Sequence, residues 1–202
     1  VNGTVFDDAM AQSIFKNTLL LIGLVTSLYG VIGAIGAERL RRFVGFMVLS
    51  SVGTLLIAIA MFNTQAWSAG LYYLVHSTLI TAAFYLFCGW ITAQRGMFKD
   101  HLKVAPKIKN EKAAALTYFL IAMMMAGLPP FSGFLGKVFI LQATAETAYQ
   151  GWIIAIILIV SLLSILALTR VGFILFWRAS PPEIDPNEAA YQTYQGLPAY
   201  AP

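Results

Sequence analysis

The sequence has little charge: Asp, Glu, Lys and Arg together make up 11% of its 202 residues. Soluble globular domains carry about 25%, so the composition excludes an ordinary soluble domain. Hydrophobic residues make up 59% and stand in long runs. Because a membrane core about 30 Å thick needs roughly 20 apolar residues per helix, and runs of this size recur, the sequence predicts an all-α polytopic membrane protein.

Cysteine and catalytic motifs are also scarce. The single cysteine, Cys88, lies in an apolar run and offers neither an intrachain disulfide nor a metal-ligand set. The sequence contains no Walker loop, dinucleotide fingerprint, nucleophile elbow or metal-spaced His/Cys cluster. We therefore expect no metal, no cofactor and no enzymatic activity of the chain itself. The net charge of +4 does not indicate nucleic acid, because the basic residues stand at the ends of apolar runs.

Five membrane spans are predicted, over residues 14–36, 43–62, 67–93, 113–145 and 152–177, the fourth being long and interrupted. Residues 1–13 are predicted to form an external N-terminal segment, 14–178 a five-helix transmembrane repeat, and 179–202 a Pro-rich cytoplasmic tail. The basic residues of 38–42, of 95–112 and at 178 fall on one side of this topology, which the positive-inside rule assigns to the cytoplasm. The N-terminus is therefore expected outside and the C-terminus inside. The chain starts at Val1 with no visible signal peptide, and we expect it to be a piece of a longer protein.

Lys137 is the most probable ion-handling residue. Placing a lysine at mid-membrane costs on the order of 3 kcal/mol or more. Lys137 also follows a segment that should break the helix. Unwound backbone survives at membrane depth only where protein or water satisfies it, so a hydrated pocket is expected in which a lysine can exchange protons. The alternative is a lysine that snorkels to the outer interface, a reach of about 12 Å. The helix-breaking residues are Gly127, Pro129, Pro130, Gly133 and Gly136.

His76, near the middle of the third span, is the second candidate, because histidine is a natural proton relay near neutral pH. The alternative is a neutral histidine bonded to a neighbouring helix. Hydroxyl side chains could line a path beside it, although serine and threonine in helices often bond only to their own backbone. Arg170, near the inner end of the last span, is interpreted as a snorkelling cation. The candidate channel-lining residues are Ser50, Ser51, Thr54, Ser77 and Thr81.

Several of these runs together resemble one family. The segment from Gly127 to Lys137, the run Tyr73-Leu74-Val75-His76-Ser77, and Leu49-Ser50-Ser51-Val52-Gly53-Thr54 are similar to the discontinuous helix and earlier helices of the proton-translocating, antiporter-like subunits. That family includes membrane subunits of respiratory complex I and the A and D subunits of Mrp-type Na⁺/H⁺ antiporters. Complex I members often carry histidine where Thr54 stands, so the pattern looks more like the Mrp D subunit.

The resemblance implies a fold and a function. Family members have about fourteen helices containing two inverted five-helix repeats, and this chain looks like the second. The implied role is the outward half-channel of a multisubunit Na⁺ or K⁺/proton antiporter in the bacterial inner membrane, with Lys137 and His76 transferring protons and other membrane subunits as partners. Two alternatives stay open: a proton-pumping membrane subunit of NADH-quinone oxidoreductase or a related hydrogenase complex, and a structural assembly subunit whose lysine is incidental.

Overall fold

The computed structural model describes residues 2–103, 110–145, 147 and 149–177, with backbone alone at 2–9 and 97. The predicted tail 179–202, Arg178 and the basic loop residues Lys107 and Lys109 lie outside the described residues.

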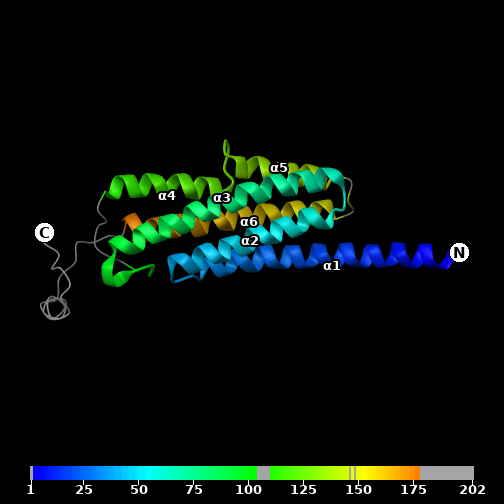
Figure 1. Ribbon diagram of the computed structural model, residues 1–202, viewed down its shortest axis with the longest axis horizontal. Coiled ribbons are helices and arrows are strands. Elements are labelled where there is room, and N and C mark those ends of the chain that lie inside the picture. The colour runs from blue at the N-terminus through cyan, green and yellow to red at the C-terminus, as the bar shows by residue number, and fades with distance from the viewer. Residues whose placement is uncertain (1, 104–109, 146, 148, 178–202) are drawn as a thin grey trace, which may run out of the picture.

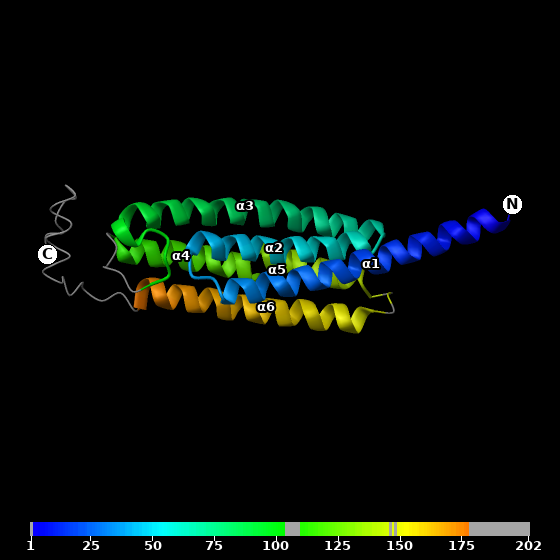
Figure 2. The ribbon, with the colours of Figure 1, turned by 90° about the horizontal axis from the view of Figure 1, so that it is seen from below.

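Long helices packed side by side make up the described part of the chain (Figure 1). α4 and α5 lie end to end, and α1 extends past the others at its N-terminal end (Figure 2). Two short elements, a 3₁₀ turn and a π-helical turn, follow α3 and α6. In chain order the elements are α1 Asn2–Ile35, α2 Leu40–Ala60, α3 Thr64–Gln94, η1 Gly96–Phe98, α4 Glu111–Ala126, α5 Ser132–Ala143, α6 Gln150–Gly172 and η2 Phe173–Trp177.

The prediction of five crossings with a discontinuous fourth is confirmed. Four stretches are long and apolar enough to cross a membrane: Met10–Ile35, Leu40–Ala60, Thr64–Gln94 and Gln150–Trp177. α4 and α5 are each shorter than the roughly 20 residues that a crossing needs, and together they form the interrupted crossing.

Residues 2–13 are helical and continuous with the apolar run of α1. The physical reason is that residues 4–13 contain neither proline nor glycine, so nothing stops the helix where the apolar run begins. The start of α3 is better defined, because the Asn63 side chain accepts a hydrogen bond from the Ala66 N–H at 2.6 Å. The same side chain donates to the Ala143 carbonyl at the end of α5, at 3.2 Å.

α1 and α2 approach closely because glycines face backbone. A Cβ on Gly53 would lie 2.7 Å from Ser27 Cα and 2.7 Å from the Gly23 carbonyl oxygen, and one on Gly30 would lie 2.7 Å from Ser50 Cα. Small residues at helix contacts are the usual means of association in membranes. Gly30 therefore packs directly against the backbone of α2, whereas a Cβ on Gly36 would meet nothing closer than 3.9 Å.

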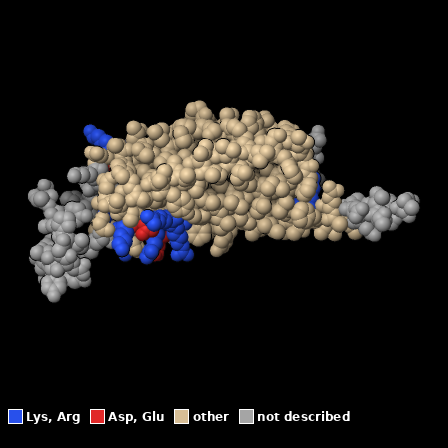
Figure 3. All heavy atoms as spheres, viewed as in Figure 1, with Lys and Arg blue, Asp and Glu red and all other residues tan. Residues whose placement is uncertain are grey.

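Charged side chains gather at the ends of the bundle, and the long face in view carries almost none (Figure 3). This distribution suits a bilayer, in which apolar side chains meet the acyl chains and charges meet water and head groups.

Candidate functional site

The break between α4 and α5 is caused by two consecutive prolines. In a continuous helix, the N–H groups at 129 and 130 would bond to the carbonyls of Met125 and Ala126, four residues earlier. Both positions are proline and have no N–H. Gly127 closes α4 in the left-handed region, at φ 75°, which glycine adopts without steric cost. Its N–H and that of Leu128 bond to the Met124 and Met123 carbonyls, so the last carbonyls of the α4 helix remain available to other donors.

Lys137 uses one of those carbonyls. Its side chain turns back from α5 toward the break, and Nζ donates to the Ala126 carbonyl at 2.9 Å and to Ser161 Oγ of α6 at 3.1 Å. Nζ also lies 3.3 Å from where a Cβ on Gly127 would stand, so the lysine closely approaches this glycine. The half-buried lysine is therefore held at the break by two neutral acceptors, rather than reaching away toward the end of α5.

His76 of α3 lies against the same break. Its Nδ1 is 2.8 Å from the hydroxyl of Ser132, the first residue of α5. Its Nε2 faces the backbone: a Cβ on Gly133 would stand 2.6 Å from Nε2 and 2.6 Å from the Met124 carbonyl oxygen. The structure thus brings the two predicted proton-transfer residues to one interruption of one helix.

The predicted channel-lining hydroxyls separate into two groups. Ser50 donates to the Ser27 carbonyl of α1 at 3.0 Å, and Thr54 to the Ser50 carbonyl of its own helix at 3.3 Å, so both serve helix packing and backbone. Ser51 accepts from the Tyr73 hydroxyl at 3.5 Å, the long limit of a hydrogen bond. The Tyr73 hydroxyl also lies beside Thr54, and the Tyr73 ring lies 6.2 Å from the His76 ring.

Ser77 and Thr81 follow His76 along α3; Ser77 is buried and Thr81 half-buried. Neither contacts Lys137 or the break through a hydrogen bond in the described part of the chain.

Sequence reasoning missed Ser161 and Ser132 as members of the site. Ser132 stands directly before Gly133, which the sequence did single out, and its proximity was a usable signal. Ser161 had no such signal, because serine is common in membrane helices and its partner lies 24 residues away.

Arg170 is an exposed side chain of α6 that reaches the end of α1. Its Nη1 donates to the Ile35 carbonyl at 2.8 Å and the Ala37 carbonyl at 3.4 Å. A cation at a helix C-terminus is favourable, so Arg170 ties α6 to the end of α1.

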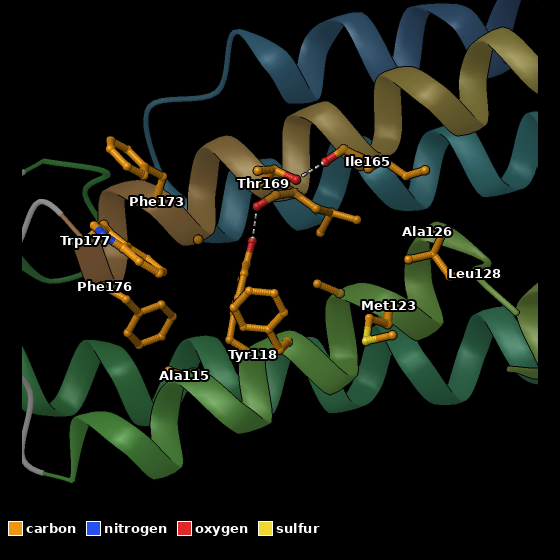
Figure 4. A pocket seen from close by; sticks show the side chains of 14 residues that line it. Ala115, Tyr118, Met123, Ala126, Leu128, Ile165, Thr169, Phe173, Phe176 and Trp177 are labelled. Atoms are coloured by element: carbon orange, nitrogen blue, oxygen red, sulfur yellow. Dashed lines mark hydrogen bonds between the residues drawn. The ribbon is translucent and has the colours of Figure 1, made fainter. Parts of the chain in front are cut away.

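A separate apolar cavity of about 380 Å³ lies between α4 and α6 (Figure 4). Its two hydroxyls are already engaged: Tyr118 donates to the Leu168 carbonyl at 2.6 Å and Thr169 to the Ile165 carbonyl at 2.8 Å. The remaining lining, which includes Phe173, is apolar, so the cavity suits hydrocarbon and offers no chain of groups to a proton. Across the described residues, no three His, Cys, Asp or Glu side chains gather to hold a metal ion.

The chain also matches a known protein family. Residues 3–166 match the profile of the transmembrane family described as NADH:quinone oxidoreductase/Mrp antiporter. The chain belongs to this antiporter family. It is therefore a multi-pass membrane protein, and the predicted family membership is confirmed.

Curated relatives within the antiporter family are Mrp-type D subunits. The chain is 29% identical over 185 residues to the D subunit of the Na⁺/H⁺ antiporter of Bacillus subtilis, covering 91% of this chain and 36% of that protein. It is 31% identical over 165 residues to the same subunit of Alkalihalophilus pseudofirmus, covering 81% and 33%. The D subunit of a probable K⁺/H⁺ antiporter of Rhizobium meliloti is 30% identical over 183 residues, covering 77% and 34%. The chain spans about a third of the length of these relatives, which are named as transporters and not as enzymes.

Solved structures share the fold of this chain. The Mrp complex of Dietzia sp. matches with a TM-score of 0.73 and 30% identity, over 83% of this chain and 31% of that one. Respiratory complex I of Thermus thermophilus matches with a TM-score of 0.74 at 19% identity, over 85% of this chain and 36% of that one.

Proposed function

We propose that the chain forms the proton-conducting, outward half-channel of a monovalent cation/proton antiporter subunit, in which Lys137 and His76 transfer protons. The observation that carries this proposal is the position of Lys137 Nζ, between the Ala126 carbonyl and the Ser161 hydroxyl. An ammonium placed in an apolar bundle without a function would be costly, and here a broken helix supplies its acceptor.

The proposed route runs from the end of the bundle where α5 ends, through Lys137, to His76. Protons would reach Lys137 from outside, because the basic loops 38–42 and 95–112 favour the opposite end as cytoplasmic. His76 would pass them toward the rest of the subunit, since its Nδ1 meets Ser132 and its Nε2 faces the break. We also propose that residues 14–178 act as one five-helix repeat, with residues 179–202 a cytoplasmic tail.

Na⁺ or K⁺ is the proposed counter-ion, and other membrane subunits of the antiporter are the proposed partners. Both follow from the relatives, whose names specify Na⁺/H⁺ or K⁺/H⁺ exchange. The identity of 30% to the Mrp structure, against 19% to complex I, favours the antiporter over a redox-linked pump. Copurification of flavin and iron–sulfur subunits would favour the pump instead.

The experiment that tests the function replaces Lys137 in the full subunit within its membrane complex. We expect Lys137→Ala to abolish Na⁺- or K⁺-dependent proton exchange in everted vesicles, measured with a fluorescent pH probe, while copurification of the partner subunits is unchanged. Lys112→Ala is the matched control, because Lys112 is exposed at the start of α4, away from the break.

Normal exchange in Lys137→Ala would refute the proposed role. Retained exchange together with lost copurification would instead identify the chain as a structural assembly element.

A further inference from the structure

Two loops at the end of the bundle where α2 begins are fastened to each other. The Leu40 N–H donates to the Asp100 carbonyl at 2.7 Å and the Leu102 N–H to the Glu38 carbonyl at 2.8 Å, which forms an antiparallel bridge. Arg95 is buried, with 4% of its surface exposed. Its guanidinium holds the second loop by donating to the His101 and Lys103 carbonyls at 2.7 and 2.6 Å. Segments about sixty residues apart in the sequence (from Leu40 to Asp100) therefore form one fixed unit.

An open, charged cavity of about 770 Å³ lies at this unit. Four cationic side chains line it, Arg39, Arg41, Arg42 and Lys99, against two carboxylates, Glu38 and Asp100. In the part of the chain that the structure describes, neither carboxylate forms an ion pair with these cations. Figure 3 shows the cluster on the side of the bundle near one end, with blue atoms outnumbering red ones. The cavity therefore keeps an uncompensated positive charge.

Arg41 and Arg42 stand where a helix disfavours them. They lie in the first turn of α2, which contains no acidic residue, and the positive end of the helix dipole repels cations. A bound anion would offset both the repulsion among the arginines and that of the dipole. Guanidinium groups present paired N–H donors that match two oxygens of a phosphate, so phosphate is the anion that this lining favours.

The position selects the source of the phosphate. The cavity lies at the ends of membrane-crossing helices, with Thr92 of α3 in its lining. Trp90, 39% exposed, lies just before it on α3, and tryptophan marks the level of the lipid head groups. Basic pockets at this level bind anionic lipids. We propose that the cavity formed by the two fastened loops binds the phosphate of an anionic phospholipid, a site that is independent of the proton route proposed above.

The test measures lipid binding to the full subunit in its delipidated membrane complex. Phosphatidylglycerol, phosphatidylcholine and inorganic phosphate are added separately, and binding is followed by native mass spectrometry and by the shift in Tm. We expect phosphatidylglycerol alone to bind and to raise Tm. The double variant Arg41→Gln/Arg42→Gln should weaken its binding about 25-fold, since each arginine near a lipid surface contributes roughly fivefold. The matched control, Lys103→Gln/Lys112→Gln, removes the same charge from two exposed residues outside the cavity and should bind normally.

Folding of the variant is checked in the same experiment. Without lipid, Arg41→Gln/Arg42→Gln should keep or raise Tm, because it removes cations from the N-terminus of α2. A second variant, Lys99→Gln, lies outside the first turn of α2 and should weaken lipid binding about fivefold. Equal losses in both double variants would show diffuse attraction and overturn the site. Inorganic phosphate acting as strongly as the lipid, or an acidic peptide displacing it more effectively, would overturn the lipid assignment.

Discussion

Gly133→Ala is the substitution that most sharply tests whether His76 and the broken helix form one unit. The new methyl group would lie 2.6 Å from His76 Nε2 and 2.6 Å from the Met124 carbonyl oxygen, and both gaps would have to open to at least 3.4 Å for an ordinary contact. The imidazole can rotate away, but only by giving up its 2.8 Å contact with Ser132, and the Met124 carbonyl is backbone of α4. Overpacking of this kind costs about 1–3 kcal/mol.

We expect Gly133→Ala to lower the free energy of unfolding by that amount and to reduce proton exchange. Stability is measured by denaturant titration in detergent, and exchange in everted vesicles of the assembled complex. Gly89→Ala is the matched control: Gly89 lies inside α3, and a Cβ there would meet nothing within 4 Å, so alanine should be neutral or stabilising by up to about 1 kcal/mol. If Gly133→Ala were as stable and as active as Gly89→Ala, the close approach of His76 to the break would be refuted.

Three further predictions concern neighbouring contacts. Ser161→Ala should slow proton exchange about tenfold without abolishing it. Lys137 keeps its carbonyl acceptor but loses a hydrogen bond of about 1.5 kcal/mol. An unchanged rate in the vesicle assay would exclude the serine from the proposed route. Gly53→Ala should lower the free energy of unfolding by about 1–3 kcal/mol, because its methyl group would meet backbone of α1. The control Gly36→Ala should leave the free energy of unfolding unchanged. Equal stabilities of the two variants would contradict the close contact of α1 and α2. Arg170→Gln should cost about 1 kcal/mol by releasing the end of α1, seen as a lower Tm, and no change in Tm would contradict the tie.

The fold was largely predictable from the sequence, because apolar runs of membrane length and a double proline are local signals. The start of α1 was not, since polar residues continue a helix when nothing stops it. Lys137 of the candidate site was predictable from the sequence, but its hydrogen-bond partners were not. Lys137 stood out by its cost in an apolar run, but its partners Ala126 and Ser161 lie across the break and on another helix. The acceptors of Arg170 were equally hidden in the sequence, because they are carbonyls more than a hundred residues away.

The Ser161 hydroxyl beside Lys137 has a consequence for a lysine that gains and loses a proton. A hydroxyl can both accept and donate a hydrogen bond, whereas a carboxylate can only accept. When Lys137 is an ammonium, Ser161 accepts from it at 3.1 Å. When Lys137 is a neutral amine, rotation of the Ser161 O–H lets it donate to the nitrogen lone pair, and a remaining N–H still reaches the Ala126 carbonyl. The same two neighbours can therefore serve both protonation states with only a hydroxyl hydrogen changing place, so that the proposed proton transfer would need no rearrangement of the heavy atoms around Lys137.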